Sequence, residues 1–254
     1  MGAVRFGRQI TTAFALACLL FASSASMADD GTLSPAQKDA VEDIVRQYLK
    51  DHPEVLVEAI QGLRAKQESD RRAQAQTALN THAAALRNDP ASPVAGNPNG
   101  DVTVVEFFDY RCGYCKRVYP SIMALLGEDQ NVRYVLKEFP ILGPESEFAS
   151  RAAQAIWFSN QDKYMPFHQT LMTMKGNLTE GRVRGAAEKL GIAPNALRKA
   201  MADPRVADTL RANYALAKAL GINGTPAFVI GNELVPGALD SAALKRLIGD
   251  ARKG

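Results

Sequence analysis

The chain has 254 residues, of which 46% are hydrophobic and 22% are charged, and its formal net charge is +3. This length and composition allow a globular core, and the weak charge excludes the strongly basic surface that nucleic-acid binding requires. No long apolar run occurs beyond the N-terminus, so a soluble protein is expected.

The N-terminus has the order of a secretory signal. Arg5 and Arg8 precede an apolar stretch over residues 10–22, and small residues follow up to Ala28. A basic start, a short apolar core and an A-x-A-like site are typical of a cleaved signal peptide, predicted here as residues 1–28. A retained membrane anchor is the alternative, although its apolar core is shorter than the about 20 residues that span a bilayer.

Cleavage changes both the cysteine count and the charge. Cys18 lies within the predicted signal peptide, so Cys112 and Cys115 are the cysteines that remain in the mature chain. The loss of Arg5 and Arg8 lowers the net charge by two, to +1. Disulfides persist in the compartments that exported proteins reach, so we expect the two thiols to be paired or to cycle between thiol and disulfide.

Residues 29–88 are predicted to form a helical arm. Ser34, Pro35 and Gln37 make a helix start with a capping box, and residues 51–54 predict a break followed by a second helix. Apolar side chains at helical spacing make one stripe, which consists of Val41, Ile44, Val45, Tyr48, Leu49, Val55, Leu56, Ala59, Ile60 and Leu63.

The arm is too thin to have a core of its own, so its apolar stripe must be buried against another surface. That surface is either the domain of the same chain or further copies of the arm. The polar sequence from residue 64 to 88 favours self-association, because it is typical of a solvated stalk rather than of a docked helix.

A linker and one α/β domain follow the arm. Pro, Gly and Asn predict the linker at residues 89–100, and residues 101–254 form the domain. Its expected elements are, in order, a doubly buried strand at 102–108, a helix at 112–126, a strand at 132–139, a helix-rich insertion at about 144–220, a hairpin that turns at Gly231 and Asn232, and a helix at 240–251.

Two cysteines at C-x-x-C spacing lie where the first strand of this domain passes into a helix. The Cys112 thiol is expected to face the free amides and positive end of that helix, with Arg111, Lys116 and Arg117 nearby. These groups favour the thiolate, because they lower a pKa that is ordinarily about 8.5. Cys112 is thus the expected attacking thiolate, exposed at the helix start, and the more buried Cys115 is expected to resolve the mixed disulfide.

Glu106 precedes the dithiol on the apolar strand. A carboxyl group buried below the dithiol would have a raised pKa and could accept the Cys115 proton during resolution. A solvent-facing glutamate without such a role is the alternative.

Zinc binding and a structural disulfide are weaker interpretations of the dithiol. Zinc needs four ligands, but no second C-x-x-C occurs, and His52, His82 and His168 are scattered along the chain. A structural disulfide across so short a loop would constrain the unfolded chain little. We therefore expect redox chemistry without a metal or other cofactor.

The stretches EFFDYRCGYC and GINGTPAFVI resemble those of the DsbA-like thiol–disulfide oxidoreductases, which have a thioredoxin fold. The resemblance covers about residues 100–252 and includes a helical insertion between the two motifs. Thr225 and Pro226 match the cis-proline loop of that family. The resemblance implies that this loop presents the Thr225 backbone to the substrate and flanks Cys112, whereas an ordinary trans proline is the alternative.

The arm sequence SPAQKDAVEDIVRQYLKDHPEVLVEAI is similar to that of ScsC-like members, the suppressor-of-copper-sensitivity type, in which the arm makes trimers and the protein shuffles disulfides. Gly113 and Tyr114, with Thr225 before Pro226, resemble the corresponding pairs in periplasmic disulfide isomerases. Strong oxidases of the DsbA type usually carry Pro-His between the cysteines. The resemblance therefore implies substrate contacts for Gly113, Tyr114, Thr225 and Pro226.

The function implied is that of a periplasmic, homo-oligomeric isomerase or reductase, which acts on unfolded or misoxidised exported proteins and is kept reduced by a membrane partner. A dithiol oxidase kept oxidised by a quinone-linked partner, and a copper-binding protein that uses the dithiol as soft ligands, are the alternatives. Apolar surface near the dithiol should bind clients. The large apolar side chains of the insertion belong either to the core or to such a groove, and they are Phe148, Trp157, Phe158, Phe167, Met172 and Met174.

Overall fold

The computed structural model describes residues 33–253. The predicted signal peptide, residues 1–28, therefore lies outside the described residues. The chain divides into two compact units, with the boundary between Arg64 and Ala65. Between residues 33 and 253, no helix is both long enough and apolar enough to cross a membrane.

The first unit contains α1 (Pro35–Asp51) and the start of α2 (Pro53–Thr81). The predicted capping box is present, because the Gln37 amide donates to Ser34 Oγ and the Ser34 amide donates to Gln37 Oε1. The predicted break falls at His52. No residue of α1 is buried, so its apolar stripe is not covered within this unit.

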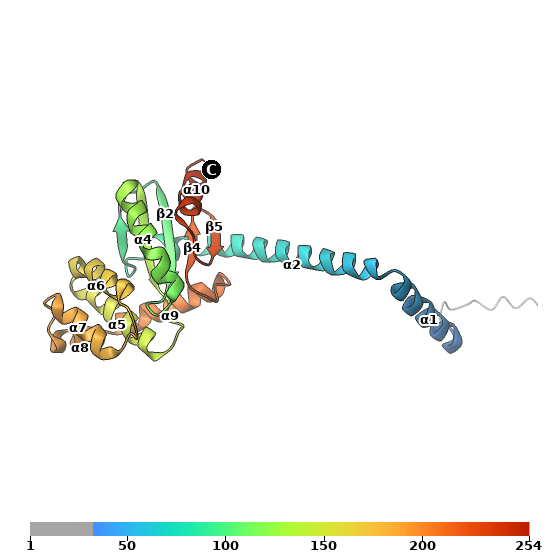
Figure 1. The fold of residues 1–254 in the computed structure, drawn as a ribbon, viewed down its shortest axis with the longest axis horizontal. Helices are drawn as coiled ribbons and strands as arrows, with labels where there is room; N and C mark the ends of the chain where they lie inside the picture. Colours follow the sequence, from blue (N-terminus) through green and yellow to red (C-terminus); the bar gives the residue numbers. More distant parts are fainter. Residues whose placement is uncertain (1–32, 254) are drawn as a thin grey trace, which may run out of the picture. The chain divides into compact units, whose positions relative to one another are not determined.

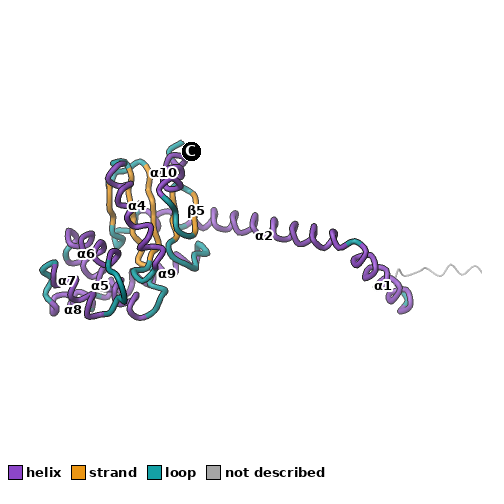
Figure 2. The backbone as a smooth tube through the Cα atoms, viewed as in Figure 1, coloured by secondary structure: helices purple, strands orange, loops and turns teal. Residues whose placement is uncertain are grey.

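A five-stranded sheet lies at the centre of the second unit (Figures 1 and 2). The strands are β1 (Val94–Gly96), β2 (Val102–Phe108), β3 (Val132–Glu138), β4 (Ala227–Ile230) and β5 (Glu233–Pro236). Their order is β1-β3-β2-β4-β5, in which β2 and β3 are parallel and the other neighbours are antiparallel. The predicted hairpin is confirmed, and Gly231, with φ of 55°, lies at its turn.

Helices surround this sheet, as expected for an α/β protein. They are α3 (Ala83–Arg87), α4 (Gly113–Glu128), α5 (Pro144–Ser159), α6 (Gln161–Thr173), α7 (Glu180–Lys189), α8 (Pro194–Met201), α9 (Pro204–Ala219) and α10 (Ser241–Ala251). The predicted helix-rich insertion between β3 and β4 consists of α5 to α9. Figure 1 shows α5 to α8 grouped to one side of the sheet, with α4 lying along the strands.

Both faces of the sheet are buried, which explains the continuous apolar sequence of β2. Val104 and Phe108 enter a core that includes α4 and α10, whereas Val105 and Phe107 enter a second core that includes the end of α9. Because successive side chains of a strand alternate between faces, Glu106 shares the α4 face with Val104 and Phe108.

The predicted linker contributes a strand to the sheet. Residues Val94–Gly96 form β1, which pairs antiparallel with β3 at the sheet edge. The prediction of a plain linker is therefore wrong at these residues. Three residues flanked by Pro, Gly and Asn are too few to show a strand pattern, and only the pairing with β3 reveals them.

The end of the arm also packs against the sheet. Leu79 in α2 and Leu86 in α3 are 3% and 1% exposed and belong to the second core. Buried Lys137 donates to Asp89 Oδ2 at 2.9 Å, which ties the segment after α3 to β3. The interpretation of residues 64–88 as a solvated stalk is therefore wrong at its C-terminal end, because two leucines among polar residues make too weak a stripe to recognise.

Candidate active site

Cys112 and Cys115 lie at the start of α4. Cys112 is the N-cap residue, and the Cys115 amide donates a hydrogen bond to its Sγ at 3.3 Å. Both cysteines are free thiols, and Cys115 is fully buried. Cys112 is only 5% exposed, so the prediction of an exposed thiol at the helix start is wrong. The segment around Thr225, distant in sequence, covers it.

This Thr225 segment brings the second predicted motif to the dithiol. Cys112 Sγ lies 3.2 Å from the Thr225 carbonyl oxygen, to which it donates a hydrogen bond when it is protonated. The Thr225–Pro226 peptide bond is cis, as expected, and Pro226 is buried. Between the two cysteines, Gly113 is exposed and the Tyr114 side chain is 58% exposed. Tyr114 and Gly113 are therefore open to contact by another chain, whereas the Cys112 sulfur is largely covered.

The two thiols have opposite pKa shifts. Hydrogen bonding with the Cys115 thiol lowers the pKa of Cys112 to about 6 against the effect of burial, and the amides of Cys115 and Tyr114 add to the shift. Burial raises the pKa of Cys115 far above its usual value, and the hydrogen bond to Cys112 raises it further. At pH 7 Cys112 is therefore mainly thiolate while Cys115 retains its proton. This asymmetry suits one sulfur to attack and the other to a later step.

The three cations predicted to stabilise the thiolate have other partners. Arg111 pairs with the Glu145 carboxylate at 3.0 Å, and Lys116 donates to the Met174 carbonyl at 2.7 Å. The Arg117 guanidinium lies over the Tyr114 ring, 5.0 Å from its centroid. Hydrogen bonds within the dithiol turn, rather than these cations, account for the low pKa of Cys112.

Glu106 is 1% exposed, so its predicted burial is confirmed. The Tyr134 hydroxyl donates to its Oε2, whereas its Oε1 has no partner among the described residues. Burial raises the pKa of Glu106 to about 8, and the negative charge of Cys112 adds to this shift. The charge of Glu106 in turn raises the pKa of Cys115. A carboxyl group that titrates near neutral pH and interacts with a buried thiol is suited to exchange a proton with it.

Sequence analysis missed a second buried carboxyl group, Glu138 at the end of β3. The hydroxyls of Tyr110 and Tyr164 donate to its Oε1 at 3.1 and 2.9 Å, and Tyr110 also lies 3.0 Å from His168 Nδ1. Burial raises the pKa of Glu138 to about 8 and lowers the pKa of His168 to about 3. The network anchors the turn that leads to Cys112. The one feature of the sequence that could have indicated this buried site was an acidic residue at the end of an apolar strand.

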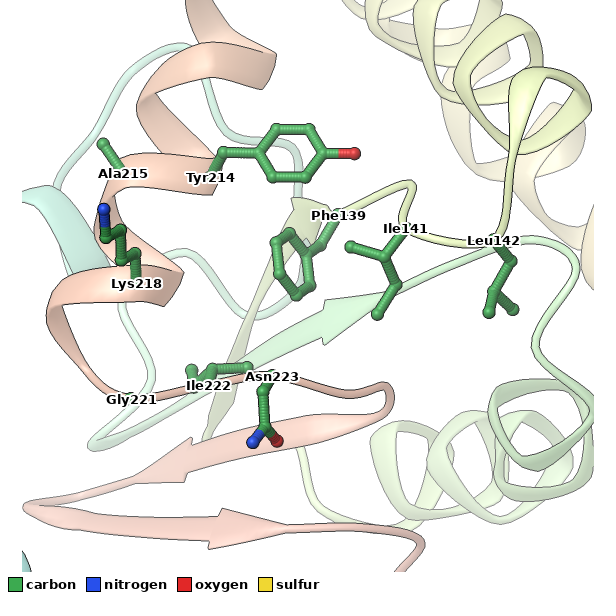
Figure 3. Close-up of a pocket in the computed structure, with 9 residues that line it drawn as sticks. All are labelled: Phe139, Ile141, Leu142, Tyr214, Ala215, Lys218, Gly221, Ile222 and Asn223. Carbon is green, nitrogen blue, oxygen red and sulfur yellow. The ribbon is translucent and has the colours of Figure 1, made fainter.

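An apolar groove lies beside the segment that precedes Thr225 (Figure 3). It is lined by Phe139, Ile141, Leu142, Tyr214, Ala215, Lys218, Gly221, Ile222 and Asn223. In residues 65–253, the large apolar side chains that are exposed are Leu142, Tyr214 and Tyr114. The Leu142 amide donates to Asp109 Oδ2 at 2.9 Å, so the groove wall is joined to the turn before Cys112.

The large apolar side chains of the insertion belong mainly to the core. Phe167 and Met172 are almost fully buried, and Phe148, Trp157 and Met174 pack against the same core while partly exposed. Phe158 lies under the Arg205 guanidinium group. None of them lines the groove of Figure 3. Helical periodicity in the sequence could not distinguish a place in the core from a place in a client-binding groove.

The histidines of the described chain lie apart from the dithiol. His168 is a buried core residue, and His52 in the arm contacts Glu54 at 3.1 Å. Over residues 33–253, no cluster of three or more His, Cys, Asp or Glu side chains is arranged to hold a metal ion.

Comparison with protein families agrees with this geometry. The DSBA-like thioredoxin domain matches residues 103–249, which include the dithiol, Glu106 and the Thr225 segment, and which make up more than half of the chain. The chain belongs to the DSBA-like thioredoxin family. The copper resistance protein ScsC N-terminal domain matches residues 37–69. The predicted resemblance of the arm to ScsC-like members is therefore confirmed.

Solved structures with this DSBA-like fold are similar over most of their length. A thioredoxin-like oxidoreductase from Silicibacter pomeroyi is 46% identical, covers 67% of this chain and 98% of its own, and has a TM-score of 0.65. A linker-deletion mutant of Proteus mirabilis ScsC is 31% identical, covers 87% of this chain and 98% of its own, and has a TM-score of 0.67. The predicted α/β thioredoxin fold is confirmed.

Curated relatives include the thiol:disulfide interchange protein DsbC of Escherichia coli, 29% identical over 157 residues, which are 61% of this chain and 54% of that protein. The Na(+)/H(+) antiporter NhaA 1 of Salinispora arenicola is 29% identical over 163 residues. This chain spans only 25% of the length of that antiporter. The chain therefore spans only part of the length of these curated relatives.

Proposed function

We propose that this DSBA-like protein is a thiol–disulfide oxidoreductase of the periplasm that acts as an oligomeric disulfide isomerase or reductase, and that Cys112 and Cys115 are its redox centre. The observation that carries the proposal is the pairing of a low-pKa Cys112 with a buried, protonated Cys115 opposite the Thr225 carbonyl. The uncovered apolar stripe of the arm supports the oligomer.

Isomerisation begins with the Cys112 thiolate, which attacks one sulfur of a client disulfide. A bond forms between Cys112 and the client, and the other client sulfur leaves as a thiolate. A different client thiolate then attacks the mixed disulfide, which creates a new client disulfide and returns the Cys112 thiolate. Client and enzyme leave this cycle in the oxidation states in which they entered.

Reduction uses Cys115 and Glu106. When Cys112 is in a mixed disulfide its negative charge is gone, so the pKa of Glu106 falls and its carboxylate becomes available as a base. Glu106 then takes the Cys115 proton, and the Cys115 sulfur attacks Cys112. The client leaves with both of its sulfurs reduced, and the enzyme leaves with a Cys112–Cys115 disulfide, which a membrane partner must reduce again.

Clients are bound by backbone and by apolar contact. The Thr225 backbone beside Pro226 faces Cys112, and exposed Gly113 and Tyr114 flank the sulfur on the other side. The groove of Figure 3 adds an apolar surface for side chains that unfolded clients expose. Backbone and apolar contacts do not require a particular client sequence, which suits an enzyme that acts on many misoxidised exported proteins.

A DsbA-like oxidase is the second candidate, and one observation favours it. The low pKa of Cys112 stabilises the reduced enzyme, so it makes the Cys112–Cys115 disulfide more oxidising. The arm favours the isomerase instead, because copies joined through it would present several dithiols to one client. The resemblance of the arm to ScsC-like members implies trimers, and we propose that copy number here, with export through the predicted signal peptide at residues 1–28.

Repair of scrambled ribonuclease by the mature chain tests this proposal. Ile44→Lys places a charge in the apolar stripe of α1, where Ile44 is 67% exposed in the single chain. Asp39→Asn changes the net charge equally on the opposite side of the helix and is the matched control. We expect Ile44→Lys to give monomers by light scattering and to lose on the order of tenfold in ribonuclease repair, while it still reduces a small disulfide.

The control variant should remain oligomeric and fully active in repair. If Ile44→Lys repairs ribonuclease as well as the control does, the arm has no part in isomerisation. Rapid oxidation of reduced ribonuclease without repair by the unaltered chain would favour the oxidase.

A further inference from the structure

A second groove starts at the dithiol and runs between α4 and the residues that join α6 to α7. It is lined by Arg111, Gly113, Lys116 and Pro120 on one side, and by Met172, Thr173, Met174, Lys175, Gly176, Asn177 and Leu178 on the other. Its volume is about 690 Å³. Because Arg111 and Gly113 adjoin Cys112 in the chain, whatever occupies this groove lies next to the reacting sulfur.

The charged side chains that line this groove are all cationic, and they are Arg111, Lys116 and Lys175. Lys116 Nζ donates to the Met174 carbonyl at 2.7 Å. Arg182 is not part of the lining, but its guanidinium donates to the carbonyl of the lining residue Asn177 at 2.6 Å and brings a further positive charge beside the groove. Within residues 33–253, no carboxylate lies within ion-pair distance of Lys116, Lys175 or Arg182.

Other cations of the same region have acidic partners. Arg184 pairs with Glu180 at 3.4 Å, and Arg111 pairs with Glu145 at 3.0 Å. Burial, followed by the nearby charge of Arg182, lowers the pKa of Lys116. The unpaired cations therefore repel one another, and an anionic group in the groove would relieve that repulsion.

Much of the remaining lining is apolar. Met172 and Leu178 are 2% and 3% exposed, and Pro120 and Met174 add further apolar surface, whereas Thr173 and Asn177 are polar. Methionine side chains adapt to partners of different shape. A free inorganic anion would leave this apolar surface unused. A polypeptide segment with acidic and apolar side chains matches both halves of the lining.

We propose that this groove binds an acidic segment of the polypeptide whose sulfur reacts with Cys112. The inference rests on the proposed function, since it adds a preference for clients or partners that carry Asp or Glu near the reacting cysteine. The cations then act twice: they attract the segment at a distance, and they hold it beside the sulfur after contact.

The test uses the reduced mature chain and two synthetic peptides, each with one cysteine joined by a disulfide to 5-thio-2-nitrobenzoate. The peptides differ only in whether Glu or Lys flanks the cysteine. Cys112 attacks the peptide sulfur and releases the coloured thiolate; Cys115 then displaces the peptide thiol and leaves an enzyme disulfide. The measured quantity is the ratio of the two second-order rate constants, acidic over basic.

We expect a ratio on the order of ten at low salt, and a decrease as ionic strength rises. The double variant Lys175→Glu, Arg182→Glu should bring the ratio to about one or below, and Lys175→Gln alone should give an intermediate value. Lys189→Glu is the control, because Lys189 is also exposed on α7 but neither lines the groove, as Lys175 does, nor bonds to a lining residue, as Arg182 does. It should keep the ratio of the unaltered chain.

The ratio of the two rate constants distinguishes the ways in which this test can fail. If the double variant did not fold, both of its rate constants would fall together, and the ratio measured for Lys175→Gln would then test the groove assignment. An unaltered chain that reacts equally with both peptides, or a Lys189→Glu ratio that falls as far as that of the double variant, overturns the groove assignment while the dithiol chemistry stands. An unaltered chain that reacts with neither peptide overturns the proposed function, and the groove assignment with it.

Discussion

The arm and the second unit, residues 65–253, which is called the catalytic unit below, differ in how far their apolar side chains are buried. In α1 no residue is buried, and Val41, Ile44, Val45 and Tyr48 are each 46% or more exposed. In residues 65–253 the exposed large apolar side chains are Tyr114, at the dithiol, and Leu142 and Tyr214, in the groove of Figure 3. A whole exposed apolar stripe supports the proposed permanent association of copies, whereas a few exposed apolar side chains beside a reactive thiol suit the proposed transient contact with clients.

This contrast predicts a division of roles. Changes in the stripe of the arm should alter assembly and leave the chemistry of each dithiol intact. Changes in the catalytic unit should alter either the chemistry or the stability of the fold.

The largest expected effect is at Cys112. Cys112→Ala removes the attacking sulfur, so disulfide exchange should fall to the rate of buffer alone, while the mass measured by light scattering should not change. Cys115→Ala retains the attack but removes resolution, so mixed disulfides with clients should accumulate and be visible on a non-reducing gel. If Cys112→Ala still exchanged disulfides while Cys115→Ala did not, the two assigned roles would be reversed.

The next effect tests where the arm ends. Leu86→Ala leaves a cavity in the second core, and we expect it to lower the free energy of unfolding by about 4 kcal/mol. Leu142→Ala is the matched control, because Leu142 is 43% exposed, and its cost should stay within about 0.5 kcal/mol. Urea denaturation measures both. Equal costs would mean that residues 79–86 do not belong to the catalytic unit.

A smaller effect concerns Glu106. Its pKa is about 8 in the folded protein and 4.5 when unperturbed, so between these pH values the folded state keeps a proton that the unfolded state releases. Stability therefore falls as pH rises from 4.5 to 8, by about 1.4 kcal/mol per unit. Glu106→Gln removes this cost, and it should stabilise the reduced protein by about 3 kcal/mol at pH 7 and by almost nothing at pH 4.

The same variant should also release mixed disulfides more slowly, because Cys115 loses its proton acceptor. Denaturation curves at pH 4 and pH 7, combined with single-turnover exchange, measure the two effects. A variant that is no more stable at pH 7 than at pH 4, relative to the unaltered protein, would contradict the burial of a titrating carboxyl group at this position.

Much of the fold could be predicted because its signals are local. The capping box at Ser34, the apolar run of β2 and the turn at Gly231 each depend on neighbours in the chain, and all three were predicted correctly. Strand β1 and the docking of Leu86 could not be predicted in this way. Their stability comes from β3 and the second core, which are distant in sequence.

By itself, the sequence determined the C-x-x-C at a strand-to-helix junction, the carboxyl group of Glu106 on the strand before it, and the second motif at Thr225. Only the tertiary structure decided that Thr225 covers Cys112, that Glu138 lies in a buried tyrosine network, and that Lys116 turns away from the thiolate toward the Met174 carbonyl. The physical reason is that burial and hydrogen bonding set the pKa of a group, and both depend on residues that the chain brings together only when it folds.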